Sequence, residues 1–353
     1  MGACYTNSLK IQYEYGIRMP TASVGEKLVD NFGREVTYVR LSVTDRCDFR
    51  CVYCMAEDMT FVPRAKILTL EELAQISTAF VQLGVEKIRI TGGEPLVRRN
   101  IVKLMRDIAN IDGLKELTLT TNGSQLPRLA GEIRAAGVRR LNISLDSLNP
   151  DLFRRITRTA ELEHVLRGID AACAAGFDKI KINAVILKNR NHKEVLPLLD
   201  FAGHRGMDIT FIEEMPLGAI EHHDRAEAYY SSDEIRRDIQ TRYTLVPTTA
   251  TTGGPSRYFN VSETDTRVGF ISPHSHNFCD TCNRVRLTAE GRLLLCLGQE
   301  HSTDLRKVVR SHPGDIETLK EAIRNSMATK PRGHDFNLTE KPIIFRHMNA
   351  IGG

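Results

Sequence analysis

The segment Val36–Cys54 reads Val-Thr-Tyr-Val-Arg-Leu-Ser-Val-Thr-Asp-Arg-Cys-Asp-Phe-Arg-Cys-Val-Tyr-Cys, and it joins a β-rich run to three closely spaced cysteines. Apolar residues alternate with polar ones from Val36 to Thr44, which predicts a strand with two different faces. Helical periodicity follows at Leu70–Leu83, so the segment opens a strand–helix unit. The same unit returns along the chain, and its repetition indicates the fold.

Six strand candidates alternate with helical stretches between residues 36 and 215. The strands are predicted at Val36–Thr44, Lys87–Thr91, Glu116–Thr121, Arg140–Asp146, Lys179–Leu187 and Asp208–Met215. Helices are predicted at Leu70–Leu83, Ile101–Ile108, Leu162–Ala175 and His192–His204. Successive units of this kind imply parallel strands joined by right-handed crossovers. We therefore predict an α/β fold, an open (βα)6 partial TIM barrel, in preference to a doubly wound sheet because the series is unbroken.

These strands alternate in polarity, whereas parallel strands buried on both faces are usually continuous apolar runs. In the fourth strand, for example, Leu141, Ile143 and Leu145 alternate with polar residues. The apolar set must face the covering helices, so the polar set faces the barrel interior. The interior is then a polar cavity lined by Arg40, Arg89, Thr120, Ser144 and Lys181. An antiparallel sheet with one face in water is the alternative, but the intervening helices argue against it.

Composition excludes several classes of partner. The 353 residues carry 48 basic and 44 acidic side chains, a balance too mild to indicate nucleic acid or a membrane surface. The sequence has neither a membrane-length apolar run nor a signal-peptide pattern, so we expect a cytoplasmic protein. Gly2 and Thr6 match a myristoylation pattern with Cys4 beside it, but so loose a pattern often arises by chance.

Six of the eight cysteines fall in two groups: Cys47, Cys51 and Cys54, and Cys279, Cys282 and Cys296. Clustering in a large chain indicates metal binding rather than disulfides. The first triad follows the first predicted strand, where barrel active sites form. Three thiolates at this spacing can hold three corners of a 4Fe–4S cluster and leave one iron open, whereas structural zinc usually takes four ligands. Cys173, in an alanine-rich helical stretch, is predicted to be a buried apolar residue.

The first triad resembles the signature of the radical S-adenosylmethionine superfamily. Thr91-Gly92-Gly93-Glu94-Pro95, at the end of the second strand, supports the resemblance, because paired glycines let backbone approach a ligand and proline stiffens the exit. It resembles the superfamily element that holds the amino group of S-adenosylmethionine. By the same resemblance, the cofactor contacts are Gly93, Ser144 and Met215, with Tyr53 at the adenine end.

The second triad consists of Cys279-x-x-Cys282 and the more distant Cys296. Taken without its context, this pattern fits a zinc site and an iron–sulfur site equally well. A fourth zinc ligand is available from His274, His276 or His301. The iron–sulfur triad upstream favours a second 4Fe–4S cluster, with its open iron facing the substrate.

From about Val36 onward, the chain resembles the GTP 3′,8-cyclase family of molybdenum cofactor synthesis. The resemblance rests on four features: the two cysteine triads, the Arg284-Val285-Arg286 motif and the terminal Gly352-Gly353. Buried cations need a neutralising anion, and a triphosphate supplies one. The family usually has an arginine where this chain has Thr210, so one expected cation is absent. The resemblance implies catalytic roles for Arg284, Arg286, Gly352 and Gly353, and GTP contacts from Arg40, Arg89, Thr120, Lys181, Arg284, Val285 and Arg286.

The resemblance implies a lyase that converts GTP to (8S)-3′,8-cyclo-7,8-dihydroguanosine 5′-triphosphate, with S-adenosylmethionine and two 4Fe–4S clusters as cofactors. A 5′-deoxyadenosyl radical would take a hydrogen atom from C3′ of GTP. The resemblance also implies a one-electron donor such as a flavodoxin and transfer of the product to cyclic pyranopterin monophosphate synthase; a homodimer is compatible with it. Two alternatives are a peptide-modifying radical enzyme with an auxiliary cluster, and a non-catalytic zinc or iron–sulfur sensor.

Four regions are expected: an N-terminal extension (1–35), the barrel (36–245), a C-terminal α+β cluster-binding extension (246–335) that closes the barrel mouth, and a tail (336–353). Thr248–Pro255 reads as a loop. Beyond it we predict short strands within Arg257–Ile271 and Val285–Cys296 and helices at Thr303–Arg310 and Asp315–Met327. A frayed end is the simplest interpretation of Gly352-Gly353. The resemblance implies instead that the tail enters the active site, where only glycine is slim enough.

Overall fold

The computed structural model describes residues 27–218, 220, 223–338, 344 and 346–352. Gly2, Cys4 and Thr6 of the acylation pattern and the final Gly353 lie outside the described residues. Within the described part of the chain, no helix is both long enough and apolar enough to span a bilayer.

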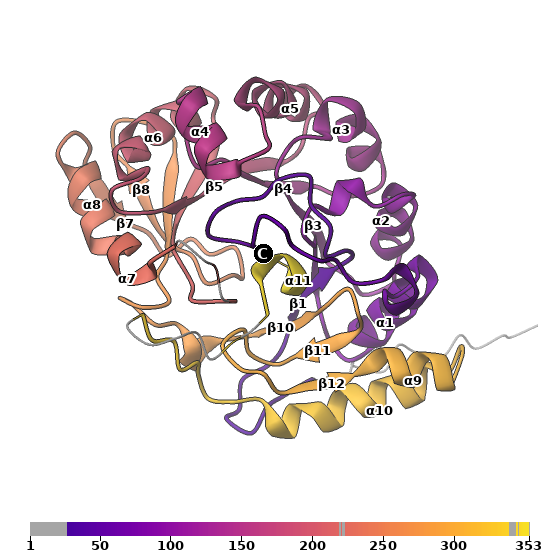
Figure 1. The fold of residues 1–353 in the computed structure, drawn as a ribbon. Coiled ribbons are helices and arrows are strands. Elements are labelled where there is room, and N and C mark those ends of the chain that lie inside the picture. Colours follow the sequence, from indigo (N-terminus) through magenta and orange to yellow (C-terminus); the bar gives the residue numbers. More distant parts are fainter. Residues whose placement is uncertain (1–26, 219, 221–222, 339–343, 345, 353) are drawn as a thin grey trace, which may run out of the picture.

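The six predicted parallel strands are present and lie side by side in one sheet (Figure 1). They pair in chain order as β1 (Tyr38–Ser42), β2 (Lys87–Thr91), β3 (Glu116–Thr121), β4 (Arg140–Ser144), β5 (Lys179–Ile186) and β6 (Asp208–Glu213). The full order is β12-β11-β10-β1-β2-β3-β4-β5-β6-β9-β8-β7, with two free ends. The sheet is therefore an open partial barrel, as predicted.

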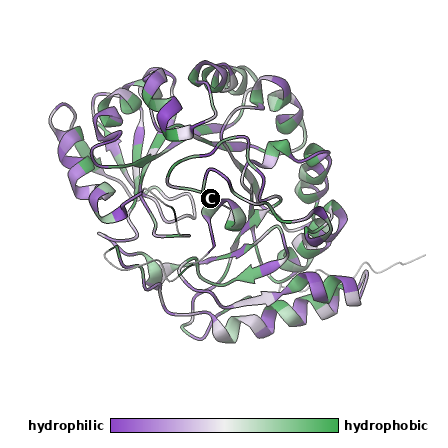
Figure 2. Ribbon diagram, in the orientation of Figure 1, coloured by the Kyte–Doolittle hydropathy of each residue, from purple (hydrophilic) through white to green (hydrophobic). Residues whose placement is uncertain are grey.

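Amphipathic helices surround the six parallel strands. They are α1 (Leu70–Gln82), α2 (Ile101–Ala109), α3 (Leu126–Ala135), α4 (Pro150–Thr157), α5 (Leu162–Ala174) and α6 (Val195–His204), the last preceded by a 3-10 turn. The α1 helix begins at Thr69, whose hydroxyl and Glu72 form a capping box. Its buried residues Leu73, Ile76 and Phe80 belong to the hydrophobic core. Figure 2 shows both hydrophilic and hydrophobic residues on these outer helices, as expected for elements with one buried face.

The elements after residue 213 extend the sheet and cover its edges. They are α7 (Arg225–Ala228), α8 (Ser232–Gln240), β7 (Leu245–Pro247), β8 (Arg257–Val261), β9 (Arg267–Ile271), β10 (Arg284–Leu287), β11 (Arg292–Leu294), β12 (Ser302–Asp304), α9 (Leu305–Ser311), α10 (Ile316–Ser326) and α11 (Met348–Ile351). The helix predicted from Thr303 begins two residues later, because Ser302–Asp304 pairs with β11. The predicted boundary between the barrel and the C-terminal extension at residue 245 stays a prediction. Strands from both sides of this boundary belong to one sheet, because β9 pairs with β6 and β10 pairs with β1.

Strand register places the two cysteine triads at opposite ends of the barrel. The β1 and β10 strands are parallel, with Tyr38 opposite Arg284. The first triad follows the end of β1, whereas Cys282 stands two residues before the start of β10. A separation of roughly 15 Å follows from the rise of about 3.3 Å per strand residue. The expectation that the cluster-binding extension closes the mouth is therefore wrong, because its triad lies at the amino-terminal ends of the strands.

The mouth of the barrel is covered by the chain's last described segment. Figure 1 shows α11 inside the ring of strands, next to the C-terminus. Asn349 and Ile351 of this helix are buried. One further prediction fails: Cys173 is exposed, because it lies on the side of α5 that faces away from the sheet.

Candidate active site

One cavity runs between the two triads, and the polar faces of the barrel strands line it as predicted. All six clustered cysteines contribute to its wall. So do the proposed cofactor contacts Tyr53, Gly93, Ser144 and Met215 and the proposed substrate contacts Arg40, Arg89, Thr120, Lys181, Arg284, Val285 and Arg286. The structure therefore brings together predicted residues that are up to 256 positions apart, from Arg40 to Cys296.

The first triad lies in the loop that leaves β1. Burial raises the pKa of all three thiols, in the case of Cys54 to about 12. A metal centre must therefore displace protons when it binds here. Three cysteines without a fourth ligand match the donor set of a cubane cluster that keeps one iron open.

The Gly-Gly-Glu-Pro motif fastens this loop to the neighbouring strands. A Cβ atom at Gly92 would lie 2.6 Å from the Thr44 carbonyl oxygen, and one at Gly93 would lie 2.5 Å from that of Arg46. Close approach by the cysteine loop therefore requires both glycines, a reason that the sequence alone did not reveal. Burial raises the pKa of Glu94 to about 8, while its carboxyl group accepts hydrogen bonds from the Leu96 N–H, the Thr121 hydroxyl and the Asn122 N–H.

A buried carboxyl group supports the predicted adenine end of the cofactor site. The Tyr53 hydroxyl donates to Asp146 at 2.7 Å, and Asp146 also accepts from the Val185 N–H at 2.9 Å. Burial raises the pKa of Asp146 to about 6. Asp146 belongs to the polar set of the fourth strand that the sequence predicts to face the cavity, and it lines the cavity as expected; its contact with Tyr53 was not predicted.

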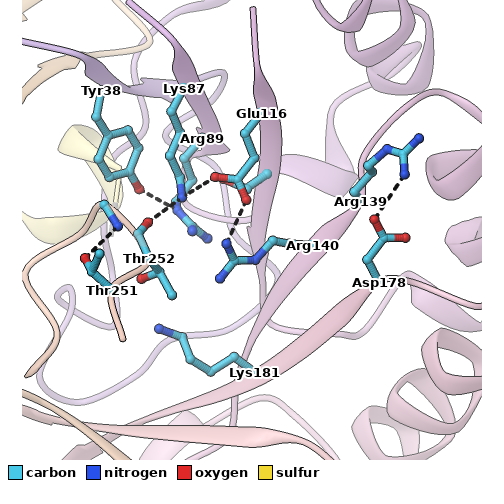
Figure 3. Close-up of polar contacts among 12 residues, drawn as sticks. Tyr38, Lys87, Arg89, Glu116, Arg139, Arg140, Asp178, Lys181, Thr251 and Thr252 are labelled. Carbon is cyan, nitrogen blue, oxygen red and sulfur yellow. Dashed lines mark hydrogen bonds and ion pairs between the residues drawn. The ribbon is translucent and has the colours of Figure 1, made fainter. Parts of the chain in front are cut away.

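Several basic side chains of the cavity wall lie near one another (Figure 3). Lys87 is in register with Tyr38, which is in register with Arg284 at the end of the second triad. Lys87 pairs with Glu116 at 2.5 Å and donates to the Thr252 carbonyl oxygen at 2.8 Å. Burial, together with the nearby cations Arg89 and Arg284, lowers the pKa of Arg40 to about 10. Such a set of cations is costly to bury without an anion.

Two tyrosines lie directly against these cations. Arg89 donates from Nε to the Tyr38 hydroxyl at 2.6 Å, and Lys181 donates from Nζ to the Tyr258 hydroxyl at 2.9 Å. Burial alone would raise both phenol pKa values. The cations outweigh it and lower the pKa of Tyr38 to about 7 and that of Tyr258 to about 8.

Several wall residues were not predicted. Tyr38 and Lys87 each stand two positions before a predicted cavity arginine, so the period of a strand could have found them. Thr252, Ser256 and Tyr258 also line the cavity or contact its cations. They come from the loop and strand after residue 247, where the sequence carried no signal of this kind.

Thr210, where the family resemblance led us to expect an arginine, is buried on β6. Its hydroxyl lies 3.4 Å from that of Ser256. A Cβ at the neighbouring Gly269 would lie 2.2 Å from the Ser256 hydroxyl oxygen and 2.8 Å from the Thr210 hydroxyl oxygen. The Thr210 hydroxyl therefore packs closely against that of Ser256, which lines the cavity.

The second triad lies beside cations of its own. Burial would raise the pKa of Cys282, but Arg284 and Lys330 outweigh it and lower the pKa, which favours a thiolate ligand. Two candidates for a fourth zinc ligand are engaged elsewhere: His274 contacts the Glu214 carbonyl oxygen and His276 contacts Asp233. Among the described residues, no three His, Cys, Asp or Glu side chains converge as a single metal ion would require.

The tail reaches the cavity: Met348 and Asn349 line it, and Gly352 contacts two of its arginines. Gly352 has a φ of +78°, and a Cβ there would lie 2.2 Å from the Thr91 hydroxyl oxygen. Its carbonyl oxygen accepts hydrogen bonds from the guanidinium groups of Arg40, at 3.4 Å, and Arg286. Gly352 is therefore buried and held, not a frayed end.

Two family models match consecutive parts of the chain. The model described as the Radical SAM superfamily matches residues 41–202, and the model described as Molybdenum Cofactor Synthesis C matches residues 207–336. The open barrel and its first triad thus define a radical S-adenosylmethionine protein, a class that uses a 4Fe–4S cluster with S-adenosylmethionine.

Curated relatives identify the family within this class of protein. A GTP 3′,8-cyclase of Saccharophagus degradans is 57% identical over 326 residues, 92% of this chain and 98% of the relative. One of Marinobacter nauticus is 59% identical over 327 residues, covering 93% and 99% respectively. The chain belongs to the GTP 3′,8-cyclase family. Among solved structures, Streptococcus suis SuiB shares the fold, with a TM-score of 0.59 at 16% identity over 83% of this chain and 69% of that chain.

Proposed function

We propose that this chain is a GTP 3′,8-cyclase, a radical S-adenosylmethionine lyase that acts on GTP in molybdenum cofactor synthesis. The observation that carries the proposal is a single cavity with a cysteine triad at each end and a cation-rich wall between them. Such a cavity can accept a radical-generating cofactor at one end and a polyanionic substrate at the other. Membership of the family supports the same reaction.

The first triad, Cys47, Cys51 and Cys54, would hold the cluster of the superfamily, and Tyr53, Gly93, Ser144 and Met215 would contact S-adenosylmethionine. When bound, the reduced cluster and S-adenosylmethionine supply a 5′-deoxyadenosyl radical that removes the C3′ hydrogen atom of GTP. The protein's part is to place the reacting atoms and to exclude water. The buried tail helix at the mouth serves the second purpose.

The second triad, Cys279, Cys282 and Cys296, would hold a second 4Fe–4S cluster whose open iron faces the guanine end of GTP. Three observations support this: the absence of a fourth cysteine in the group, the lowered pKa of Cys282, and the location of the triad on the cavity wall. The histidines considered for a zinc site make other contacts, so zinc is not favoured.

The cations between the triads would hold the triphosphate by charge-assisted hydrogen bonds. From the predicted set these are Arg40, Arg89, Lys181, Arg284 and Arg286, with Thr120 and Val285 as further contacts. Tyr38 and Lys87 would join them, because they share the same wall. Gly352 and Gly353, with Arg284 and Arg286, would place the substrate for the radical step.

The reaction needs a one-electron donor, for which a flavodoxin is suitable, and its product would pass to cyclic pyranopterin monophosphate synthase. We place the protein in the cytoplasm, independent of nucleic acid and membranes, and a homodimer is compatible with this function. We also retain the four-part division of the chain at residues 35, 245 and 335.

The test is an anaerobic assay with GTP, S-adenosylmethionine and a chemical reductant, combined with metal analysis. We expect about eight irons per chain, no zinc, 5′-deoxyadenosine, and a cyclised nucleotide that retains its triphosphate. Zinc in place of iron would refute the second cluster. Cleavage of S-adenosylmethionine without any change in GTP would instead favour the peptide-modifying alternative.

A further inference from the structure

Two charged side chains are buried in the segment predicted as an N-terminal extension. Asp30 is 5% exposed and Arg34 is 9% exposed. The Asp30 carboxylate accepts from the backbone N–H groups of Phe32 and Arg34, at 2.9 and 3.0 Å, and from Arg34 Nε at 2.7 Å. The core residues Leu28 and Val36 flank this turn and are joined by a backbone hydrogen bond of 2.7 Å. The turn is therefore fixed, and Asp30 sets the direction of the Arg34 guanidinium.

The guanidinium of Arg34 reaches the second triad. One Nη atom donates to the Cys279 carbonyl oxygen at 2.8 Å and to the Arg332 carbonyl oxygen at 2.6 Å. The other Nη atom donates to the Pro331 carbonyl oxygen at 2.6 Å. Because Nε is bound to Asp30, one planar group joins the N-terminal segment, a cysteine of the triad and the chain after α10. Arginine presents such donors in a fixed fork, whereas the ammonium group of lysine is a single point.

The chain just after α10 contacts every cysteine of the second triad. Lys330 donates from Nζ to the Cys282 carbonyl oxygen at 3.4 Å. The Gly333 carbonyl oxygen lies 3.9 Å from the Sγ atom of Cys296. A Cβ atom at Gly333 would lie 3.4 Å from the Sγ atom of Cys279. Groups that fix this stretch of chain therefore also help to fix the three cysteines relative to one another.

The buried charges of this network do not balance. Lys330 is buried, and its Nζ atom lies 3.6 Å from the Asp30 carboxylate, which also pairs with Arg34. Two cations and one carboxylate leave one positive charge in excess, and excess charge is costly to bury. The thiolate ligands of a cluster bound at the second triad would supply negative charge beside it. The network therefore fits the metal-bound form of the triad.

Groups that orient metal ligands affect how tightly the metal is held, even though they do not touch it. We propose that Arg34 is a positioning residue for the second triad: together with Asp30, it holds the three cysteines in the arrangement that retains their iron–sulfur cluster. This inference rests on the function proposed above, because it requires a 4Fe–4S cluster at that triad. It gives the residues before the barrel a role in binding a cofactor, for which the sequence pattern carried no signal.

Arg34→Lys tests the proposal because it keeps the positive charge and removes the fork of donors. The substitution is made in the Cys51→Ala background, so that the iron of the second triad can be followed alone. We expect an iron chelator to remove this iron about tenfold to a hundredfold faster under anaerobic conditions, the range in which metal affinity falls when supporting groups are lost. The electron paramagnetic resonance signal of the reduced cluster should disappear at the same rate.

Two controls separate positioning from a general loosening of the fold. Arg225→Lys in the same background is a matched variant, because the Arg225 side chain is 8% exposed, like that of Arg34, and pairs with the buried Glu214. It also donates to two backbone carbonyl oxygens, but its partners belong to the segment after β6. The rate of iron loss should therefore stay at its parent value. In the Cys282→Ala background, Arg34→Lys should leave the release of iron from the first cluster unchanged.

Asp30→Asn tests whether the carboxylate acts through Arg34, and it is also the milder change if Arg34→Lys folds poorly. It should speed the loss of iron from the second triad. The variant that combines Asp30→Asn with Arg34→Lys should lose iron about as fast as Arg34→Lys alone, because effects of residues that act as a unit do not add. Effects that multiply would overturn the role of Asp30.

An unchanged rate in Arg34→Lys would overturn the proposal. Equal acceleration in Arg34→Lys and Arg225→Lys would overturn it as well, and so would faster loss of iron from both clusters, since either result would show a general role in folding. Zinc in place of iron at the second triad of the native protein would refute the second cluster and this role together. A native protein that holds both clusters but leaves GTP unchanged would refute the proposed function alone.

Discussion

At the scale of single residues, the charge of two tyrosines determines how much positive charge the cavity offers. Tyr38 lies against Arg89, and Tyr258 lies against Lys181. Each phenol becomes an anion more easily than usual, because nearby cations outweigh the effect of burial. If these cations bind the triphosphate as proposed, an ionised phenol would compete with it for the same cation.

We expect GTP binding to weaken as pH rises through about 8, the pKa of Tyr258 in the free protein. Below this pH the phenol is neutral and Lys181 is available; above it, binding must first protonate the phenol. The dissociation constant should therefore rise by up to about tenfold per pH unit for the one proton that Tyr258 takes up, and Tyr38, whose pKa is about 7, adds to the dependence in the same direction. The phosphate groups of GTP do not contribute to this pH dependence, because their second pKa is about 6 and they are already ionised above pH 7. Anaerobic calorimetry from pH 7 to 9 measures the effect, and Tyr258→Phe should reduce the slope and leave the part that is due to Tyr38. An unchanged slope in that variant would contradict the assignment.

Gly352 permits a second test at this scale. In Gly352→Ala, the new methyl group would overlap the Thr91 hydroxyl, so the tail must move. We expect GTP cyclisation to fall by about a hundredfold, because ångström-scale misplacement has that effect near reacting atoms. Gly314→Ala is the matched control, since Gly314 has a similar φ of +81° with nothing within 4 Å of its Cβ position. Equal losses in the two variants would show backbone strain, not the clash, to be the cause.

At the scale of elements, the two triads lie on separate segments, so each can be removed alone. The first lies in the loop after β1, and the second combines the segment before β10 with Cys296 after β11. Cys51→Ala should reduce the iron content from about eight to about four atoms and abolish 5′-deoxyadenosine formation, because a cubane held by two cysteines is poorly bound. Normal cleavage of S-adenosylmethionine by this variant would disprove the assignment of the first triad.

Cys282→Ala should also leave about four irons, but S-adenosylmethionine cleavage should persist while productive GTP binding is lost. The reason is distance: the two triads lie at opposite ends of β1 and β10. Iron analysis, 5′-deoxyadenosine formation and GTP binding are measured on the same sample. Loss of both activities together would show that the two ends of the cavity are not independent.

The elements that the sequence predicts well are those with a local period. The strand from Lys87 and the helix from Leu70 follow directly from the spacing of apolar residues. The opposite placement of the triads depends instead on the pairing of Tyr38 with Arg284, and no local pattern reports pairing between distant strands. The same is true of Thr252, which the sequence identifies as a loop residue but not as a partner of Lys87.

At the scale of the whole molecule, both edges of the parallel barrel are covered by strands from the second part of the chain. The β9 strand pairs with β6 and the β10 strand pairs with β1. Without them, two edges expose unpaired N–H and carbonyl groups, which promotes aggregation. The function of the barrel and its stability thus both depend on residues after 245.

A fragment that ends at residue 245 should therefore fail to remain a soluble monomer, although it contains the first triad and all six parallel strands. Size-exclusion chromatography and circular dichroism of the purified fragment test this. The full chain prepared alongside it is the control. A monomeric fragment with cooperative unfolding would show that the proposed division at residue 245 separates an independent domain.

The pairing of β1 with β10 also determines the order in which the barrel folds during synthesis. Tyr38 meets Lys87 early in synthesis, but it meets Arg284 only after about 246 further residues exist. Contacts between such distant segments form slowly, since the intervening chain must first be brought together. During that interval the first cysteines are already present in a half-built barrel with no tail to shield them. Delivery of iron and sulfide should therefore follow folding, and oxygen should be most damaging to newly made protein.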